Sequence, residues 1–358
     1  MSSRIETEKK YYCINNRNLL DKIKQLDYKL VSSNEETDEY FTDINSEYIK
    51  NRTCLRIRKS NNNMEVTFKG KSKVLSNIFT KLETNFSISA ENYDDFVKLF
   101  AMLGYNTYTV VKKKRSTYQL KKKDYTYNIM VDDIEELGNF VEFEIITEAL
   151  LVDECLLKNK INKFVSLFSG LDLEEARLPY RDFVAKKKYN DILPSKKVKG
   201  IHINLDQFLK SYEKEFYSYY KLIIKKSLNI SIKWNEFKKD VYNSMFNSDI
   251  TSKFDEYFNN LGIYDNKFIT FFELVKKIKN MGFEVVLSTN INKTFIDYLV
   301  EQTNVDRIIH LNNNASIHNE LKKNNIDIKE FFNIVKSNLN EINSYLLIII
   351  NNYDITKR

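Results

Sequence analysis

The segment Arg4–Tyr12, RIETEKKYY, carries two acidic residues and one basic residue at alternate positions. Side chains alternate between the two faces of a β-strand, so Glu6, Glu8 and Lys10 would point to the same side. Two carboxylates beside an ammonium group suit a surface that binds a divalent cation together with an anion. A single row of this kind is more often a solvated strand face of mixed charge, so it needs partners before it indicates a site.

Rows with the same two-residue spacing recur along the chain: Arg56/Arg58, Thr67/Lys69, Lys113/Arg115 and Glu142/Glu144. In two of these segments apolar residues occupy the opposite face: Leu55 and Ile57 opposite Arg56, and Val141, Phe143 and Ile145 opposite Glu142. Burying unpaired charge is costly, so a charged inner face persists only if its charges pair or bind ions. The recurrence therefore indicates a binding site lined by strands.

The region between Tyr28 and Ile146 reads mostly as extended segments. Strands are expected at 28–31, 39–43, 53–59, 64–69, 79–88, 108–122, 125–131 and 140–147, after the N-terminal strand. Apolar residues at helical spacing predict helices at 16–26 and 92–103. About eight mainly antiparallel strands with two outer helices would close into a β-barrel, which creates an inner face for the charged rows.

Taken in order, these segments resemble the CYTH superfamily, the triphosphate tunnel metalloenzymes, which includes class IV adenylyl cyclases, thiamine triphosphatases and inorganic triphosphatases. RIETEKKYY resembles the family's E-x-E-x-K signature. VDDIEELGNFVEFEI at 131–145 resembles its Asp-x-x-x-x-Leu-Gly-x-Phe-x-Glu-x-Glu segment. LRIRK at 55–59, TFKGK at 67–71 and VVKKKRSTY at 110–118 follow the family's order between them. The resemblance covers residues 1–188 and ends in LPYRDFV, which is similar to the family's C-terminal helix.

The resemblance implies an N-terminal α+β domain, an eight-stranded antiparallel β-barrel (the triphosphate tunnel) with outer helices. It implies Mg²⁺ or Mn²⁺ as cofactor and a triphosphate-containing small molecule as substrate. The implied catalytic residues are Glu6, Glu8, Lys10, Glu142 and Glu144. The implied substrate-binding residues are Lys10, Arg56, Arg58, Lys69, Lys113 and Arg115. The implied metal ligands are Glu6, Glu8, Glu83, Asp132, Glu142 and Glu144. In KLETN at 81–85 the sequence departs from the family, because Asn85 stands in place of its second acid.

The residue types agree with this chemistry. A triphosphate carries about four negative charges at neutral pH, and Arg and Lys bind it by charge-assisted hydrogen bonds. Carboxylate oxygens are the ligands that Mg²⁺ and Mn²⁺ prefer. All three histidines lie at or beyond His202, so no Ser–His or Cys–His pair is available for covalent catalysis in 1–188.

We expect hydrolysis of a triphosphate group, with two alternatives. A class IV adenylyl cyclase would need the same triphosphate clamp, so the charged rows do not separate the two reactions. A non-catalytic sensor of polyphosphate or nucleotide would bind the anion only, and the glutamates at the end of the tunnel count against it.

A second domain is expected at 200–358, after a basic, Pro-containing linker at 189–199. Strands are expected at 201–205, 283–287, 307–311 and 345–350, and helices at 271–281, 293–302 and 328–339. This alternation predicts an α/β doubly wound parallel sheet. Helical sequence up to about residue 261, after the first strand, predicts a helical cap.

This second domain resembles the haloacid-dehalogenase-like (HAD-like) phosphatases. The matching segments are IHINLDQF at 201–208, VVLSTN at 285–290 with Thr289 as the phosphate-binding hydroxyl, and LLIIINN at 346–352. Asn204 replaces the nucleophilic Asp of that family while Asp206 remains, and Asn351 and Asn352 replace its metal-binding acids. An amide is neither a carboxylate nucleophile nor a good Mg²⁺ ligand, so we expect a catalytically inactive domain with an unknown partner.

Composition sets the remaining limits. The 358 residues exceed one typical domain, and a hydrophobic fraction of 42% suffices for packed cores. Acidic residues are interspersed in a chain of net charge +7, which argues against a dedicated nucleic-acid binder. The cysteines form no zinc-ligand spacing or disulfide framework, and the longest apolar run, 346–350, is far too short to span a bilayer. We expect a cytoplasmic protein without membrane association; a homodimer stays open.

Overall fold

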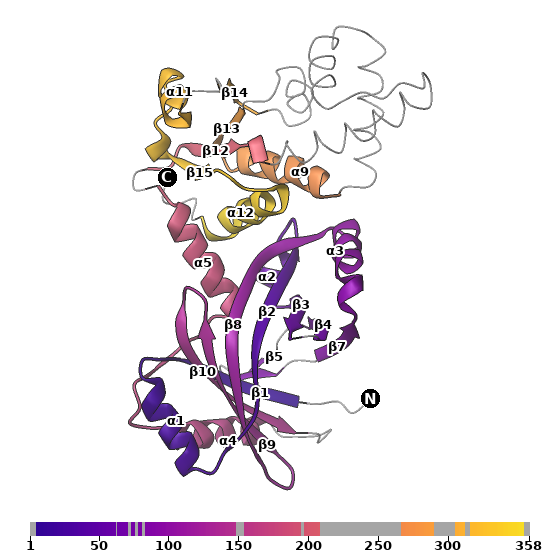
Figure 1. Cartoon of the computed structure of the whole chain (residues 1–358), viewed down its shortest axis with the longest axis vertical. Helices are drawn as coiled ribbons and strands as arrows, with labels where there is room; N and C mark the ends of the chain where they lie inside the picture. The colour runs from indigo at the N-terminus through magenta and orange to yellow at the C-terminus, as the bar shows by residue number, and fades with distance from the viewer. Residues whose placement is uncertain are drawn as a thin grey trace. The chain divides into compact units, whose positions relative to one another are not determined.

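The computed structural model describes residues 5–61, 63–70, 73–75, 78–80, 83–147, 154–194, 197–207, 266–289, 305–311 and 316–353. The chain divides into two compact units (Figure 1). The first comprises Met1–Lys98 and Thr107–Lys187, and the second comprises Leu99–Asn106 and Lys188–Arg358.

The first unit is built on a nine-stranded sheet with the order β11-β1-β10-β9-β8-β2-β3-β4-β7. The strands are β1 (Ile5–Cys13), β2 (Lys29–Asp43), β3 (Cys54–Ser60), β4 (Asn63–Lys69), β7 (Glu83–Ile88), β8 (Tyr105–Lys121), β9 (Thr126–Ile134), β10 (Gly138–Thr147) and β11 (Leu173–Glu175). A separate hairpin is formed by β5 (Lys73–Leu75) and β6 (Ile78–Thr80), and β6 lies beside β1. The strand pairs with a described register are antiparallel, as expected.

The sheet curls so that strands from its two ends meet. β1 lies near one end of the order, whereas β4 and β7 lie at the other. Nevertheless, Lys69 Nζ on β4 lies 3.7 Å from Glu6 Oε2 on β1 and 2.6 Å from Glu83 Oε2 on β7. The sheet therefore encloses an inner face.

The strand count differs from the expected eight. The segments expected at 28–31 and 39–43 belong to one 15-residue strand, β2, whose middle is polar and so lacks the apolar alternation that identifies a strand. The segment expected at 79–88 is divided between β6 and β7. β11 has 3 residues, which is too short for periodicity to reveal.

Helices connect or flank the strands of this sheet. They are α1 (Asn16–Gln25), α2 (Glu47–Lys50), α3 (Tyr93–Met102), α4 (Glu154–Ser166) and α5 (Tyr180–Ile192), with a 3₁₀ turn at Ala90–Asn92. α1 and α4 lie near one another (Figure 1), and Leu19 of α1 and Phe164 of α4 share one core with Phe143 and Ile145 of β10. Because neighbouring residues of a strand face opposite ways, this packing directs Glu142 and Glu144 to the inside.

Two helices expected from the sequence are present, and the expected linker begins inside a third helix. The helices expected at 16–26 and 92–103 correspond to α1 and α3. α5 continues to Ile192, so the first residues of the expected linker at 189–199 are helical. Within the described residues, no helix is long and apolar enough to cross a membrane.

The second unit contains the expected parallel sheet. Its strands are β12 (Gly200–Asn204), β13 (Glu284–Thr289), β14 (Arg307–His310) and β15 (Phe331–Ile334), in the order β14-β13-β12-β15. Its described helices are α9 (Asn266–Asn280), α11 (Ile317–Lys323) and α12 (Leu339–Asn352), with a 3₁₀ turn at Ile328–Glu330. α9 packs against β13 and α12, and Leu321 of α11 packs against Val286 of β13. The expected cap and the helix at 293–302 lie outside the described residues.

The last expected strand, 345–350, is wrong because it lies inside α12. A short apolar run does not by itself distinguish a buried strand from a buried helix. The deciding signal is the capping box of Asn338 and Glu341, which starts the helix upstream of the run. The helix expected at 328–339 contains a 3₁₀ turn and β15 instead.

This correction removes one part of the expected phosphatase-like pattern. Asn351 and Asn352 end α12, and their side chains donate to the Leu347 and Ile348 carbonyls at 2.7 and 2.8 Å. They do not follow a strand, so they cannot be aligned with acids at a strand end.

Phe143 tests the outer core of the first unit. It is fully buried, and its ring centroid lies 5.4 Å from Phe164 and 4.9 Å from Phe168. Phe143→Ala should lower the free energy of unfolding by about 3–5 kcal/mol, because it leaves a cavity. Urea titration followed by circular dichroism measures this change. The control, Ile14→Ala at a 78% exposed position, should change it by less than about 0.5 kcal/mol. Equal midpoints for both variants would contradict the packing described here.

Candidate functional site

The register of the sheet places the charged rows side by side on the inner face. Directly opposite pairs are Glu8 with Glu144, Lys10 with Glu142, Arg115 with Asp132, Asp38 with Arg58, Arg56 with Thr67, and Lys69 with Glu83. Directly opposite residues share a face of the sheet. Segments far apart in the sequence therefore contribute to one continuous lining.

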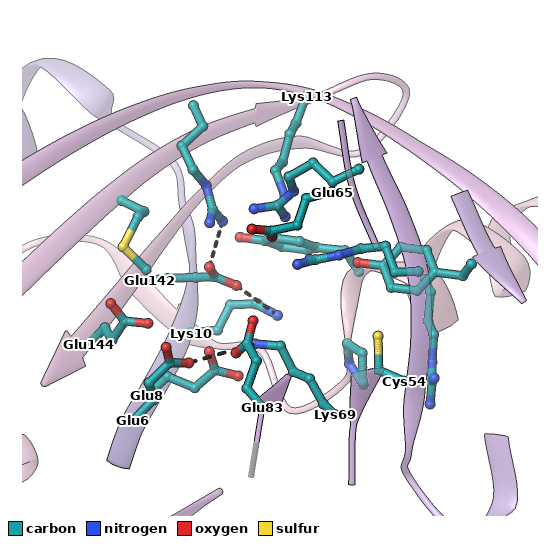
Figure 2. A pocket seen from close by; sticks show the side chains of 18 of the residues that line it. Glu6, Glu8, Lys10, Cys54, Glu65, Lys69, Glu83, Lys113, Glu142 and Glu144 are labelled. Carbon is teal, nitrogen blue, oxygen red and sulfur yellow. Dashed lines mark hydrogen bonds and ion pairs between the residues drawn. The ribbon is translucent and has the colours of Figure 1, made fainter. Parts of the chain in front are cut away.

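This lining surrounds a pocket in the first unit (Figure 2). Most of the sequence-predicted site residues line it: Glu6, Glu8, Lys10, Arg56, Arg58, Lys69, Glu83, Lys113, Arg115, Glu142 and Glu144. Residues that were not predicted also line it: Tyr40, Thr53, Cys54, Glu65, Met130, Pro179, Tyr180 and Arg181. The structure thus brings the predicted set together, with Asp132 behind the lining.

One side of the pocket is a cluster of carboxylates. Figure 2 shows Glu6, Glu8 and Glu144 next to one another, across the pocket from Lys113. Burial, together with the neighbouring carboxylate of Glu144, raises the pKa of Glu6 to about 8. Burial raises the pKa of Glu144 to about 7, although Asn128 Nδ2 donates to its Oε2 at 2.7 Å. Glu6 and Glu144 therefore hold a proton more tightly than an ordinary carboxyl group, although the Lys69 ammonium, 3.7 Å from Glu6 Oε2, partly offsets this effect at Glu6.

The donor chemistry of this cluster fits a divalent cation. Carboxylate oxygens are hard ligands, and a doubly charged ion would cancel the repulsion that raises the pKa of Glu6 and Glu144. Among the described residues, no three His, Cys, Asp or Glu side chains already converge as a ligand set. The individual metal ligands therefore stay a prediction.

Arg56 has the environment expected of a phosphate-binding residue. Its Nη2 donates to Thr67 Oγ1 at 3.1 Å, and Nη1 lies 3.7 Å from Asp38 Oδ2. Its Nε is buried and has no hydrogen-bond partner among the residues that the structure describes. Leaving a buried donor unsatisfied is costly, and a phosphate oxygen would satisfy it.

An acidic pair behind the cations was not predicted. Arg58 donates to both oxygens of Asp38 at 2.6 and 2.8 Å, and Lys113 Nζ donates to Asp38 Oδ2 at 2.9 Å. Glu36 Oε2 lies 3.3 Å from Arg58 and 3.2 Å from Lys113. Burial alone would raise the pKa of Asp38, but Lys113, Arg56 and Arg58 together lower it well below its usual range. Glu36 and Asp38 follow the two-residue spacing, so extending the expected strand into the polar part of β2 would have found them.

Asp132 has a different setting from the one that the resemblance implies. Arg115 donates to its two oxygens at 2.6 and 2.5 Å, and the Tyr180 hydroxyl donates to Oδ2 at 2.8 Å. The carboxylate is fully buried and both oxygens are engaged. This geometry favours a role in positioning Arg115 over a role as metal ligand.

Glu142 also lies among cations. Its Oε1 lies 3.0 Å from Lys10 Nζ, and its Oε2 accepts a hydrogen bond from Arg115 at 2.6 Å. Burial would raise its pKa, but Lys10, Arg115 and Lys113 lower it far below its ordinary value. Glu142 is therefore an ionised partner of two cations, whereas Glu144, two residues later, belongs to the carboxylate cluster.

The start of α5 forms part of the wall. The Tyr180 ring lies 3.8 Å from Lys10 Nζ, a cation–π contact, and Arg181 Nη1 donates to the Thr53 carbonyl. These residues belong to the LPYRDFV segment. The family resemblance predicted a helix there, but it did not predict that side chains of the helix reach the pocket.

In the second unit, two of the three expected motifs lie together at the carboxyl ends of β12 and β13. Thr289 Oγ1 donates to Asp206 Oδ1 at 2.9 Å, and Asn204 Nδ2 donates to Ser288 Oγ at 3.2 Å. Parallel α/β sheets bind ligands at this edge. The phosphatase-like assignment stays a prediction.

The carboxylate cluster generates a prediction about pH. An acid whose pKa rises from 4.5 to about 7 in the folded state binds its proton more tightly there than in the unfolded chain. In metal-free protein, Glu144 should therefore lower the free energy of unfolding increasingly as the pH rises between these values. Glu144→Gln should match the wild type in melting temperature at pH 5 and exceed it at pH 8. Thermal unfolding in EDTA measures both, and a difference that shrinks with rising pH would contradict the assignment.

The first unit is similar in sequence to known proteins. The CYTH domain model matches residues 4–178. A candidate adenylate cyclase of Methanocaldococcus jannaschii is 29% identical over 140 residues, which is 39% of this chain and 76% of that protein. A solved structure from Pyrococcus horikoshii is 26% identical with a TM-score of 0.42, covering 51% of this chain and 99% of that one. A candidate adenylyl cyclase from Hippeastrum, described with a dominant triphosphatase activity, is 14% identical with a TM-score of 0.39, covering 52% and 95%. Residues 4–178 of this chain are a CYTH domain.

Proposed function

We propose that the first unit hydrolyses a triphosphate group with the help of Mg²⁺ or Mn²⁺. One observation carries this proposal: a single pocket combines a set of largely buried cations with a cluster of partly buried carboxylates, of which Glu6 and Glu144 have a raised pKa. The cations suit a phosphate chain, and the carboxylates suit a divalent cation.

The residues of the pocket would act mainly by positioning and by neutralising charge, because phosphoryl transfer has a loose transition state. Arg56 would donate its unsatisfied Nε–H to a phosphate oxygen. Arg115 and Lys10 would hold further oxygens while Glu142 keeps both side chains in place. Glu6, Glu8 and Glu144 would hold the metal ion, which when bound lowers the pKa of water and stabilises negative charge on phosphate oxygens.

Adenylyl cyclisation is the second candidate. The similarity to a candidate adenylate cyclase favours it. In that reaction the ribose 3′-hydroxyl attacks the α-phosphorus and pyrophosphate leaves, so the same cations and carboxylates are required. A non-catalytic sensor is less well supported, because anion binding alone gives no reason for Glu6, Glu8 and Glu144 to lie together.

For the second unit, we propose a HAD-like fold without phosphatase activity. The amide of Asn204 occupies the end of β12, where the resemblance places the nucleophilic carboxylate, and an amide cannot form the phosphoenzyme. A cytoplasmic location, a homodimer and a partner of the second unit remain predictions.

Product analysis decides between the reactions. Purified protein is incubated with Mg²⁺ or Mn²⁺ and inorganic triphosphate, ATP or thiamine triphosphate, and products are followed by phosphorus NMR. Hydrolysis releases orthophosphate, whereas cyclisation of ATP gives cyclic AMP and pyrophosphate. Glu6→Gln and Glu144→Gln should abolish turnover while circular dichroism stays unchanged, because each substitution removes a charge and preserves shape.

The control for this experiment is Glu135→Gln, an exposed glutamate whose Oε2 lies 3.3 Å from Lys112 Nζ. It should retain turnover. Wild-type activity in Glu144→Gln would contradict a catalytic role of the carboxylate cluster. If ATP gives cyclic AMP, the protein is an adenylyl cyclase and the proposal of hydrolysis is wrong.

Substitutions on the two sides of the pocket should weaken the binding of different ligands. Arg56→Ala should weaken triphosphate binding about 30- to 150-fold, from a loss of roughly 2–3 kcal/mol per desolvated charge-assisted contact. Its affinity for Mn²⁺ alone should change little. Glu144→Gln should show the reverse, with weakened Mn²⁺ binding and unchanged or improved metal-free triphosphate binding. Isothermal titration of both ligands into both variants measures this. If both variants lose the same amount of affinity for the same ligand, the charged residues of the pocket form a single network of ion pairs that neutralise one another.

A further inference from the structure

Asp38 lies at the centre of the cationic side of the pocket but is not a lining residue. Its carboxylate is fully buried, and it contacts Arg58 in bidentate fashion, Lys113 and, at 3.7 Å, Arg56. The Tyr40 hydroxyl donates to it at 3.5 Å. Its partners are therefore side chains of the site, including three that are predicted to bind triphosphate.

The cations of the pocket are already largely neutralised by buried acids. Glu36 and Asp38 face Arg56, Arg58 and Lys113, which leaves a single excess positive charge in that group. The other cations have their own acidic partners: Lys10 and Arg115 pair with Glu142, Arg115 also pairs with Asp132, and Lys69 pairs with Glu83. A bare triphosphate, with about four negative charges, would gain little from so balanced a lining and would meet buried acids behind it.

We propose that Asp38, assisted by Glu36, is a positioning residue that acts as an internal counter-anion. It orients Arg58 and Lys113. It also lowers the affinity of the pocket for a triphosphate that has no divalent cation bound to it. The tunnel would thereby select the metal complex of the triphosphate over the free anion. This inference rests on the proposed function, since it concerns the same substrate class.

The geometry supports alignment as well as charge compensation. A bidentate carboxylate fixes the plane of a guanidinium group, so Asp38 sets the orientation in which Arg58 meets a ligand. The Lys113 ammonium is almost fully buried, with a side-chain exposure of 2%, and the Asp38 carboxylate compensates the charge that its burial would otherwise penalise. Removing the charge of Asp38 should therefore have two effects. Arg58 should become less well oriented, and the pocket should attract anions more strongly.

Asp38→Asn separates these two effects. Titration calorimetry with sodium tripolyphosphate is run in EDTA and in Mg²⁺. In EDTA the variant should bind tripolyphosphate on the order of tenfold more tightly than the wild type, because one buried negative charge near the ligand is gone. The gain in affinity on adding Mg²⁺ should shrink, and kcat should fall without a rise in KM. A merely structural role would instead weaken binding in both conditions.

Two further variants complete the experiment. Glu35→Gln removes the same charge from the same strand at an exposed position paired with Lys114, and it should change neither affinity by more than about twofold. If Asp38→Asn does not fold, Glu36→Gln carries the test, with a smaller change in the same direction. Unchanged or weaker metal-free binding in the variant that folds overturns this inference alone. Failure of the wild type to bind tripolyphosphate in Mg²⁺ overturns the proposed function and the inference with it.

Discussion

The structure of the first unit depends on the high cost of burying an unpaired charge. Its inner face carries more ionisable groups than a protein interior normally accepts, and the fold meets this cost by pairing them across strands. Asp38 and Asp132 are fully buried and each accepts two hydrogen bonds from one arginine. Around Glu6 and Glu144, burial and neighbouring carboxylates outweigh the attraction of Lys69 and raise the pKa of both acids. This cluster is where we propose that the divalent cation binds.

Much of this site could be predicted because strand periodicity converts spacing into direction. The E-x-E-x-K, R-x-R and E-x-E rows needed only alternation to be assigned to one face, and the antiparallel register then brings Lys10 opposite Glu142. Glu36 and Asp38 follow the same rule but lie in a polar stretch of β2 that shows no apolar alternation. Asp132 was selected, but sequence could not reveal that Arg115 and Tyr180 occupy its oxygens, because that depends on how three segments meet in space.

In the second unit, the pattern of apolar residues did not always distinguish a strand from a helix. β12 and β13 were predictable because short β-branched runs followed by polar residues are typical of parallel strands. The run 346–350 has the same composition, yet it forms the buried centre of α12, where packing surrounds the helix with apolar neighbours. Periodicity carries no information when every position is buried, and only the capping residues Asn338 and Glu341 record the difference.

The paired acids and bases of the pocket also have an evolutionary consequence. Losing Asp38 alone leaves Arg56, Arg58 and Lys113 with a larger excess of buried positive charge, whereas losing Arg58 together with it does not. The same holds for Arg115 and Asp132. Such positions should therefore change in concert among homologues, passing through few viable single-substitution intermediates. Glu6 and Glu144 repel one another, so the proposed cation between them, and not a matched arginine, should keep both acids in place during evolution.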